Sequence, residues 1–292
     1  MKIGLVLEGG ANRGVFTSGV LDYFMEQDLG KAFRYVIGTS AGAGNAMNFI
    51  SGQHGRSRDT TITKDKRYAY FGLKNIIRTG HLFDMENIYW RVPTEYNLFD
   101  FDAYFRNPIE REYTATNCLT GQAEYLTDYG TDRRYLMNIG MASSALPGAT
   151  PAVVINGIPY ADGGVADSIP VRFFESIGYK RNLIILTQPK GFVKQKNKML
   201  PLIRARYVRY PAFVEAVADR HQRYNETLAY ISMLEQSGRA FVIRPPIPLE
   251  IPSMERDPAQ LRRVYETGRA VAQIQIDKIA AYVEESKAAP EE

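Results

Sequence analysis

The chain has 292 residues, of which 45% are hydrophobic, and its formal net charge at pH 7 is +4. This composition can fill the core of one large α/β domain, or of one domain with a smaller addition, and it excludes a largely disordered chain. The small net charge excludes polyanion binding driven by overall charge, so no nucleic acid is expected as a partner.

A single cysteine, Cys118, rules out an internal disulfide and fits a reducing compartment. We expect Cys118 to be buried and unreactive, and a lone cysteine builds no metal site. The first apolar run ends at Glu8, which is too short for a signal-peptide core, and no stretch approaches the roughly 20 apolar residues of a membrane span. The expected location is the cytoplasm, and peripheral contact with a membrane stays open.

The first 50 residues predict alternating strands and helices. Residues 3–7 form a short apolar run that enters a tight, glycine-rich loop, and an apolar stripe after Gly14 indicates a helix. Residues 35–37 indicate a second strand, and a small-residue run after Ser40 leads into a second helix. Strand–helix–strand–helix over so short a distance favours a parallel sheet with right-handed crossovers.

The middle of the chain mixes an insertion with further strands. Residues 52–110 are polar and aromatic with weak periodicity, so we expect short helices that cover one end of the sheet. Residues 113–127 indicate a hairpin, residues 132–146 a helix, and residues 152–155 and 183–187 strands. These elements extend the predicted sheet.

A Gly-x-Ser-x-Gly motif lies between the second strand and the second helix. It consists of Gly38, Thr39, Ser40, Ala41 and Gly42. The motif is common by chance, but in this context a strained turn lifts the serine clear of the sheet, and the helix N-terminus favours an anionic transition state. Ser40 is therefore the candidate nucleophile; the alternative is a small-residue turn that only packs a helix closely on the sheet.

The loop after the first strand reads Gly9, Gly10, Ala11, Asn12, Arg13 and Gly14. It does not match a dinucleotide fingerprint, because Ala11 replaces the middle glycine and no acidic residue follows the second strand. Successive backbone N–H groups suit an anion, which in an acyl hydrolase is the tetrahedral oxyanion. A turn without a ligand is the alternative. Arg13 could orient an acidic substrate group or pair with a neighbouring carboxylate.

A serine nucleophile needs a proton acceptor, and the usual histidine is poorly placed here. The chain has His54, His81 and His221, of which the first two fall in the insertion. Only His221 is late enough for the order of an α/β-hydrolase triad, and it lies in a charged, helical-looking stretch. We expect each of them to be a surface or capping residue.

Asp162 is the stronger candidate for the general base. It follows the Asn156-Gly157 hairpin turn and precedes Gly163 and Gly164, which leave room for the carboxylate to approach another loop. A carboxylate accepts a proton at pH 7, and burial increases its basicity. The alternative is that Asp162 only caps a turn.

Together, these motifs resemble the patatin-like phospholipases over residues 3–188. The Ser143-Ser144 segment before Pro147 and the sequence that follows Asp162 also look like that family. The resemblance implies a three-layer α/β/α fold with a mostly parallel sheet and a Ser–Asp dyad without histidine, metal or cofactor. It implies Ser40 as nucleophile, Asp162 as general base, the N–H groups of residues 9–14 as oxyanion hole, and a lipid acyl ester as substrate. Ala11 departs from the family's glycine, and the loop is expected to work if Ala11 keeps φ below zero.

Residues 189–292 are expected to form a mainly helical extension, with a last helix at 257–285, beside a catalytic domain at 1–188. Basic residues alternate with apolar and aromatic ones over 190–210. This pattern fits either contact with an anionic bilayer surface or a solvated face of helices that pack over the sheet.

Three hypotheses follow. The first is a lipid acyl hydrolase with a Ser40–Asp162 dyad, of the phospholipase A or lysophospholipase type. The second is a Ser–His–Asp esterase that depends on His221. The third is a non-enzymatic lipid-binding or regulatory protein on the same scaffold, for which Ala11 is the hint. The residues name no head group, acyl position or chain length.

Overall fold

A mostly parallel sheet forms the middle layer of the protein, whose computed structural model describes residues 3–68, 71–72, 75–77 and 81–288. In this part of the chain the sheet has eight strands in the order β5-β6-β3-β2-β1-β7-β8, with β4 paired to β3. The run from β3 to β8 is parallel, whereas β4, β5 and β6 add antiparallel pairs. The strands are β1 (Ile3–Leu7), β2 (Tyr35–Thr39), β3 (Glu110–Asn117), β4 (Ala123–Leu126), β5 (Val153–Ile155), β6 (Ile158–Asp162), β7 (Arg181–Ile185) and β8 (Ala240–Ile243).

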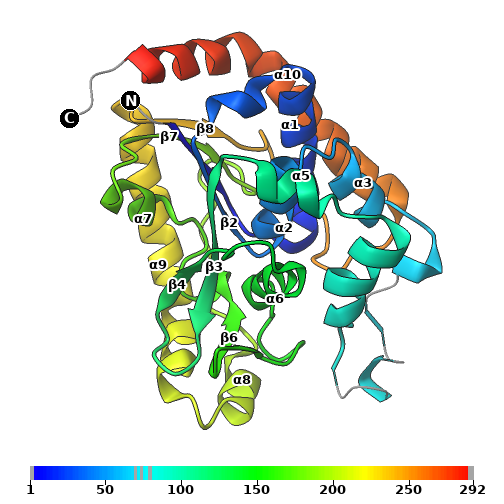
Figure 1. The fold of residues 1–292 in the computed structure, drawn as a ribbon. Coiled ribbons are helices and arrows are strands. Elements are labelled where there is room, and N and C mark those ends of the chain that lie inside the picture. Colours follow the sequence, from blue (N-terminus) through cyan, green and yellow to red (C-terminus); the bar gives the residue numbers. More distant parts are fainter. Residues whose placement is uncertain (1–2, 69–70, 73–74, 78–80, 289–292) are drawn as a thin grey trace.

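Side chains of β1 alternate between two hydrophobic cores, which makes the fold three-layered. Leu5 and Leu7 belong to the core that includes α1, α2, α6 and α10, whereas Val6 belongs to the core with α7 and α9. The two sets of helices lie on opposite faces of the sheet (Figure 1). The helices are α1 (Gly14–Glu26), α2 (Ala41–Ile50), α6 (Arg133–Ser143), α7 (Val171–Ser176), α9 (Pro211–Gln236) and α10 (Pro258–Ala288). The predicted α/β/α class is confirmed.

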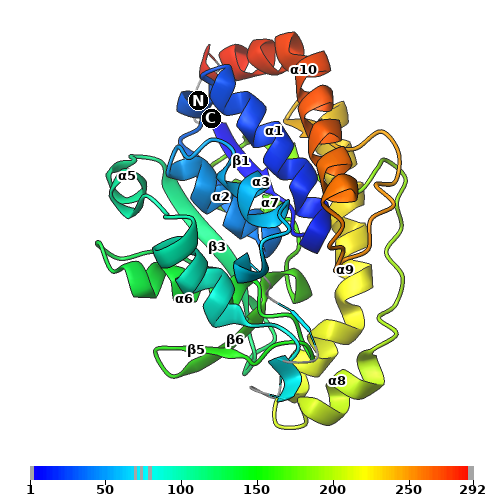
Figure 2. The same cartoon turned by 90° about the vertical axis from the view of Figure 1, so that its right-hand side faces the viewer.

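Short helices fill the segment between α2 and β3, as expected for an insertion. They are α3 (Arg56–Thr61), η3 (Lys66–Tyr68), the π-helix η4 (Asn87–Tyr96) and α5 (Phe101–Arg106). Helix α3 packs on α1 and α2, and η4 packs on α6 (Figure 2). The insertion therefore lies over the carboxyl end of β2, where Ser40 is found.

The C-terminal region contains a strand that the sequence analysis did not predict. Strand β8 pairs in parallel with β7, so the region described as mainly helical also extends the sheet. Four residues are too few to show strand periodicity, and their pairing with a strand about 60 residues earlier is a tertiary property. Helix α8 (Leu200–Arg206) and α9 pack under β6, and the division of the chain at residue 188 stays a prediction.

Helix α10 crosses α1 in direct backbone contact. A Cβ atom added to Gly19 would lie 2.1 Å from the carbonyl oxygen of Tyr265, and one added to Gly268 would lie 2.1 Å from that of Phe16. No side chain fits at either glycine without moving the other helix. The two glycines therefore set the close packing of α1 and α10.

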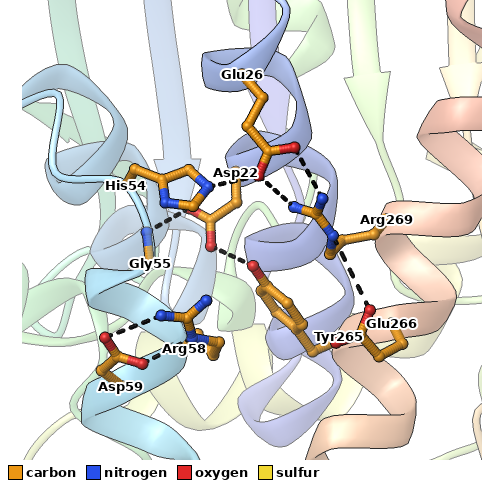
Figure 3. Close-up of polar contacts among 9 residues, drawn as sticks. All are labelled: Asp22, Glu26, His54, Gly55, Arg58, Asp59, Tyr265, Glu266 and Arg269. Atoms are coloured by element: carbon orange, nitrogen blue, oxygen red, sulfur yellow. Dashed lines mark hydrogen bonds and ion pairs between the residues drawn. The ribbon is translucent and has the colours of Figure 1, made fainter.

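A polar network joins the same two helices to the start of the insertion (Figure 3). Asp22 accepts hydrogen bonds from the Tyr265 hydroxyl at 2.7 Å and from the Gly55 amide at 2.9 Å. Both terminal nitrogens of Arg269 donate to the two oxygens of Glu26, and His54 lies 2.7 Å from the same carboxylate. The hydrogen bonds from Arg269 lower the pKa of Glu26 to about 2. His54 thus belongs to a structural ion network.

Within the described residues, none of the helices is long and apolar enough to cross a membrane.

Candidate active site

Ser40 occupies a strained turn between β2 and α2. Its φ of 56° and ψ of −120° are rarely adopted by residues other than glycine. The glycines beside it have a packing reason, because an added Cβ on Gly38 would lie 2.4 Å from the Gly42 carbonyl oxygen, and one on Gly42 would lie 2.4 Å from that of Leu7. The close approach of α2 to the sheet holds the turn in shape and presents the serine hydroxyl.

Asp162 ends β6, which runs in the opposite direction to β2, the strand that leads to Ser40. The Ser40 hydroxyl donates to Oδ2 of Asp162 at 2.7 Å, and the Gly164 amide donates to Oδ1 at 2.7 Å. The Asp162 backbone is fixed as well, because its amide donates to the Ala145 carbonyl oxygen and its own carbonyl accepts from the Thr116 hydroxyl. Both carboxylate oxygens therefore have defined partners.

The following glycines allow this approach. An added Cβ on Gly163 would lie 2.0 Å from the carbonyl oxygen of Thr114 in β3. The Asp162 side chain is buried, and burial raises the pKa of its carboxyl group. The positive charge of Arg220 and the hydrogen bonds from Ser40 and Gly164 oppose that rise. A buried carboxylate of raised basicity beside a hydroxyl is the arrangement that general-base catalysis requires.

Ser143 supports the nucleophile turn in a way that sequence reasoning did not identify. The Ser40 amide donates to the Ser143 hydroxyl at 2.9 Å, which in turn donates to the Thr114 carbonyl oxygen at 2.7 Å. Its neighbour Ser144 accepts from the Tyr89 hydroxyl at 2.6 Å. The available signal was the position of both serines in a segment that resembled the family.

The glycine loop passes directly beside the turn. An added Cβ on Gly9 would lie 3.1 Å from the Cβ of Ser40, and one on Gly10 would lie 2.7 Å from the Thr187 hydroxyl. In the described residues no backbone hydrogen bond uses the amide of Gly10 or Ala11 as donor. These two N–H groups are thus free to donate to an anion near Ser40.

The condition of a negative φ at Ala11 is not met: its φ is +47°, in the left-handed region. The loop therefore adopts a conformation that favours glycine although the residue is alanine, at a cost of about 1 kcal/mol. The next residue holds the loop in place, because the Asn12 side chain donates to the carbonyl oxygens of Pro252 and Glu255. Asn12 therefore anchors the loop, and it also lines the cavity beside Ser40.

Glu8, immediately before the loop, was not singled out from the sequence. Its carboxylate accepts from the Thr187 amide at 2.5 Å and from the Tyr224 hydroxyl at 2.6 Å. It is almost fully buried and joins β1 to β7 and α9. Glu8 thereby couples the C-terminal region to the base of the glycine loop.

A cavity of about 270 Å³ opens beside Ser40. Residues of α1, α2 and the insertion line it, together with residues of the loop after α6 and Ser253. Much of its lining is apolar, including Met47, Met85, Ile88, Tyr89, Val92, Phe99, Met137 and Leu146. A pocket of this size and polarity suits a hydrocarbon chain whose end reaches the serine.

The three histidines lie elsewhere in the described structure. His54 contacts Glu26, His81 contacts Arg206, and Nδ1 of His221 lies 3.0 Å from the carbonyl oxygen of Ala218 within α9. The Ser40 hydroxyl donates instead to Asp162. The described residues contain no cluster of three or more side chains that could hold a metal ion.

The chain belongs to the patatin-like phospholipase family, whose sequence model matches residues 5–174. A second family model, described as a domain of unknown function (DUF6363), matches residues 210–284. The first match ends within α7, and the second begins immediately before α9. Ser40, Asp162 and the glycine loop lie in the first match, and Arg220 and Tyr224 lie in the second.

Protein YjjU of Escherichia coli (strain K12), described as uncharacterized, is 31% identical over 274 residues, which are 92% of this chain and 75% of that protein. "Lysophospholipase NTE1" of Eremothecium gossypii is 28% identical over 61% of this chain but only 11% of that protein, so this chain spans about a ninth of its length. The crystal structure of VipD from Legionella pneumophila matches with a TM-score of 0.52 and 14% identity, over 95% of this chain and 67% of that one. VipD therefore supports the fold alone.

Proposed function

We propose that the protein is a serine acyl hydrolase that cleaves carboxylic esters of lipids, of the phospholipase A or lysophospholipase type. The observation that carries the proposal is the 2.7 Å hydrogen bond from the strained Ser40 to the buried Asp162, at the end of a largely apolar cavity. Membership of the patatin-like family and the similarity to lysophospholipases support the same chemistry.

The reaction follows from the geometry in two steps. Ser40 attacks the ester carbonyl carbon while Asp162 takes the hydroxyl proton, and the N–H groups of Gly10 and Ala11 donate to the oxyanion. Collapse of the tetrahedral intermediate returns the proton to the leaving alcohol and leaves an acyl-enzyme on Ser40. Asp162 then removes a proton from water, which attacks the acyl group. Collapse of the second tetrahedral intermediate returns that proton to the Ser40 oxygen and releases the fatty acid.

Matched variants test this proposal. Ser40→Ala and Asp162→Asn should each lower ester hydrolysis by roughly 10³-fold or more, because each removes one half of the proton transfer. Ser176→Ala, on the exposed side of α7, serves as the control and should keep full activity. Hydrolysis of lysophospholipid, followed by mass spectrometry, is the measurement; full activity of folded Ser40→Ala protein would refute the dyad.

A fluorophosphonate probe separates this proposal from a non-enzymatic scaffold. Labelling at Ser40 requires an activated hydroxyl and an oxyanion site, so wild-type protein should react and Asp162→Asn protein should not. Absence of labelling in folded wild-type protein would favour a lipid-binding role. A His221→Ala protein should keep its activity, whereas a Ser–His–Asp esterase would lose it.

We also propose that residues 190–210 contact an anionic membrane surface. Between Glu175 and Glu215 the chain has no acidic residue, and the stretch carries the basic residues Lys190, Lys194, Lys196, Lys198, Arg204, Arg206 and Arg209. Val193, Met199, Leu202 and Val208 are each more than half exposed. Exposed aliphatic side chains next to uncompensated cations suit an anionic bilayer interface.

Vesicle sedimentation tests this contact. Wild-type protein should bind vesicles that contain phosphatidylglycerol more strongly than pure phosphatidylcholine vesicles, and Leu202→Glu with Val208→Glu should abolish the difference. Hydrolysis of a monomeric short-chain ester by the double variant should stay unchanged. Equal binding to both vesicle types would contradict the proposal.

A further inference from the structure

Three cationic side chains near the catalytic pair have no anionic partner. Arg13, Lys194 and Arg220 form no side-chain hydrogen bond and no ion pair within 4.0 Å among the described residues. The Nε atoms of Arg13 and Arg220 are buried without a hydrogen-bond partner. Buried guanidinium groups normally satisfy their donors, so a ligand is the simplest acceptor for these.

Arg220 comes close to Asp162 without pairing with it. A Cβ on Gly164 would lie 2.9 Å from Oδ1 of Asp162 and 3.0 Å from a terminal nitrogen of Arg220, so these two atoms lie less than 6 Å apart. Helix α9, which carries Arg220, lies outside the matched patatin-like segment. The C-terminal region thus places a cation near the Asp162 carboxylate.

Lys194 is held toward the same place by α9. Asn225 accepts a hydrogen bond from the Lys194 amide at 2.8 Å and donates to its carbonyl oxygen at 3.1 Å. The ammonium group lies 4.3 Å from the centre of the Tyr224 ring. Tyr224 donates to Glu8, whose two oxygens are both used by neutral donors. Lys194 is therefore positioned without a neutralising ion pair.

The charges in this cluster do not balance. Three cations face two carboxylates, Glu8 and Asp162, and the cations repel one another. Burial and the positive charges of Arg220 and Arg13 lower the pKa of Lys194 to about 8, although Glu8 and Asp162 oppose this. A bound anion would supply the missing negative charge. Lys194 and both arginines remain partly exposed, so solvent ligands can reach them.

We propose that Lys194 and Arg220, with Arg13, bind a phosphate group of the ester substrate beside Ser40. Two guanidinium groups and one ammonium group offer converging donors to the tetrahedral oxygens of a phosphate. Arg220 lies less than 6 Å from the Asp162 carboxylate that accepts from the Ser40 hydroxyl, so we assign the anion to the molecule that is cleaved; this step rests on the proposed function. The same donors could hold free inorganic phosphate, and the experiment separates the two sources.

A pair of monomeric substrates tests the proposed phosphate site directly. 1-Decanoyl lysophosphatidylglycerol and 1-decanoylglycerol carry the same acyl ester and differ in the phosphate-bearing head group. Lys194→Met and Arg220→Met should each lower the ratio of kcat/KM for the phosphate ester to that for the neutral ester by about 10-fold or more. Lys180→Met, an exposed lysine between α7 and β7, is the control and should keep the ratio.

Ligand binding to a variant without the Ser40 hydroxyl gives an independent test of the anion site. Ser40→Ala protein should bind sn-glycerol 3-phosphate in calorimetry, more tightly than inorganic phosphate, and the added Lys194→Met change should weaken binding. Because protonated Lys194 favours an anion, affinity should fall above about pH 8 in the protein that retains Lys194 and stay flatter without it. This arm decides the anion site even if the protein proves not to hydrolyse esters.

Three outcomes would count against the proposal. If the substrate ratio is unchanged in both Lys194→Met and Arg220→Met, the cluster does not read the substrate. If inorganic phosphate binds as tightly as sn-glycerol 3-phosphate and the ratio is unchanged, the cluster holds free phosphate. A loss of both substrates in equal proportion would show that Arg220 acts only through Asp162.

Discussion

Two long helices of the C-terminal region, α9 and α10, cover opposite faces of the sheet and contribute in different ways. Helix α10 meets α1 backbone to backbone at Gly19 and Gly268. Helix α9 brings Tyr224 and Arg220 to the carboxyl end of the strands, where Ser40 lies. Helix α10 thus contributes to packing, whereas helix α9 contributes charged and polar side chains near Ser40 and Asp162.

The largest effect is expected at the α1–α10 crossing. Gly268→Val should lower the free energy of unfolding by about 3 kcal/mol or more, because its Cβ would collide with the Phe16 carbonyl oxygen. Urea unfolding is the measurement, and Ala270→Val on the exposed side of α10 should cost only about 0.5 kcal/mol. Similar losses in both variants would mean that the helices are not closely packed.

A smaller effect, confined to catalysis, is expected from α9. The charge of Arg220 lowers the pKa of Asp162, so Arg220→Met should raise that pKa and move the acid limb of kcat/KM for a neutral ester to higher pH. Lys194→Met should move the acid limb less, since the charge of Lys194 lowers the pKa of Asp162 less than the charge of Arg220 does. A pH–rate profile with an unmoved limb in Arg220→Met would contradict the assigned role of α9.

The ion network between α1 and α10 should add less than about 1 kcal/mol, because its carboxylate is partly exposed. The pKa of Glu26 is depressed to about 2, so the network stabilises the fold above pH 4.5 and this contribution is lost as the pH falls toward 2. Glu26→Gln should remove that part of the pH dependence, measured by thermal unfolding between pH 2 and 5. If the stability of Glu26→Gln depended on pH as that of the wild type does, the network would contribute nothing to stability.

The smallest effect is expected at Cys118, beneath α8 and α9. The thiol is buried, and burial raises its pKa to about 12, so native protein should not react with a thiol-specific reagent at pH 8. Reaction should appear only on unfolding. Labelling of native protein would show that α8 and α9 open readily.

The candidate pair Ser40 and Asp162 could be found from the sequence because each residue lies in a short motif with its own local constraint. Gly38 and Gly42 are needed for the turn at Ser40, and Gly163 is needed where Asp162 meets β3. Local steric requirements of this kind leave glycines at fixed spacings, which a sequence displays. The cavity, by contrast, was expected only in outline, as a pocket formed partly by residues 52–110.

Three features could not be predicted from local pattern. Strand β8 is too short to show a period, and Ala11 adopts φ +47° because neighbouring segments hold its loop. The cluster of Arg13, Lys194 and Arg220 joins residues about 200 positions apart, so their shared environment has no sequence signature.

The sequence by itself determined the α/β class, the position of the main strands along the chain and the identity of Ser40 and Asp162 as a candidate pair, because glycine spacing and hydrophobic periodicity are local. Only the tertiary structure decided that the two side chains meet at 2.7 Å, that β8 joins the sheet, and that α9 brings cations to the site. Those properties depend on contacts between distant segments, where burial and charge act across the fold and not along the chain.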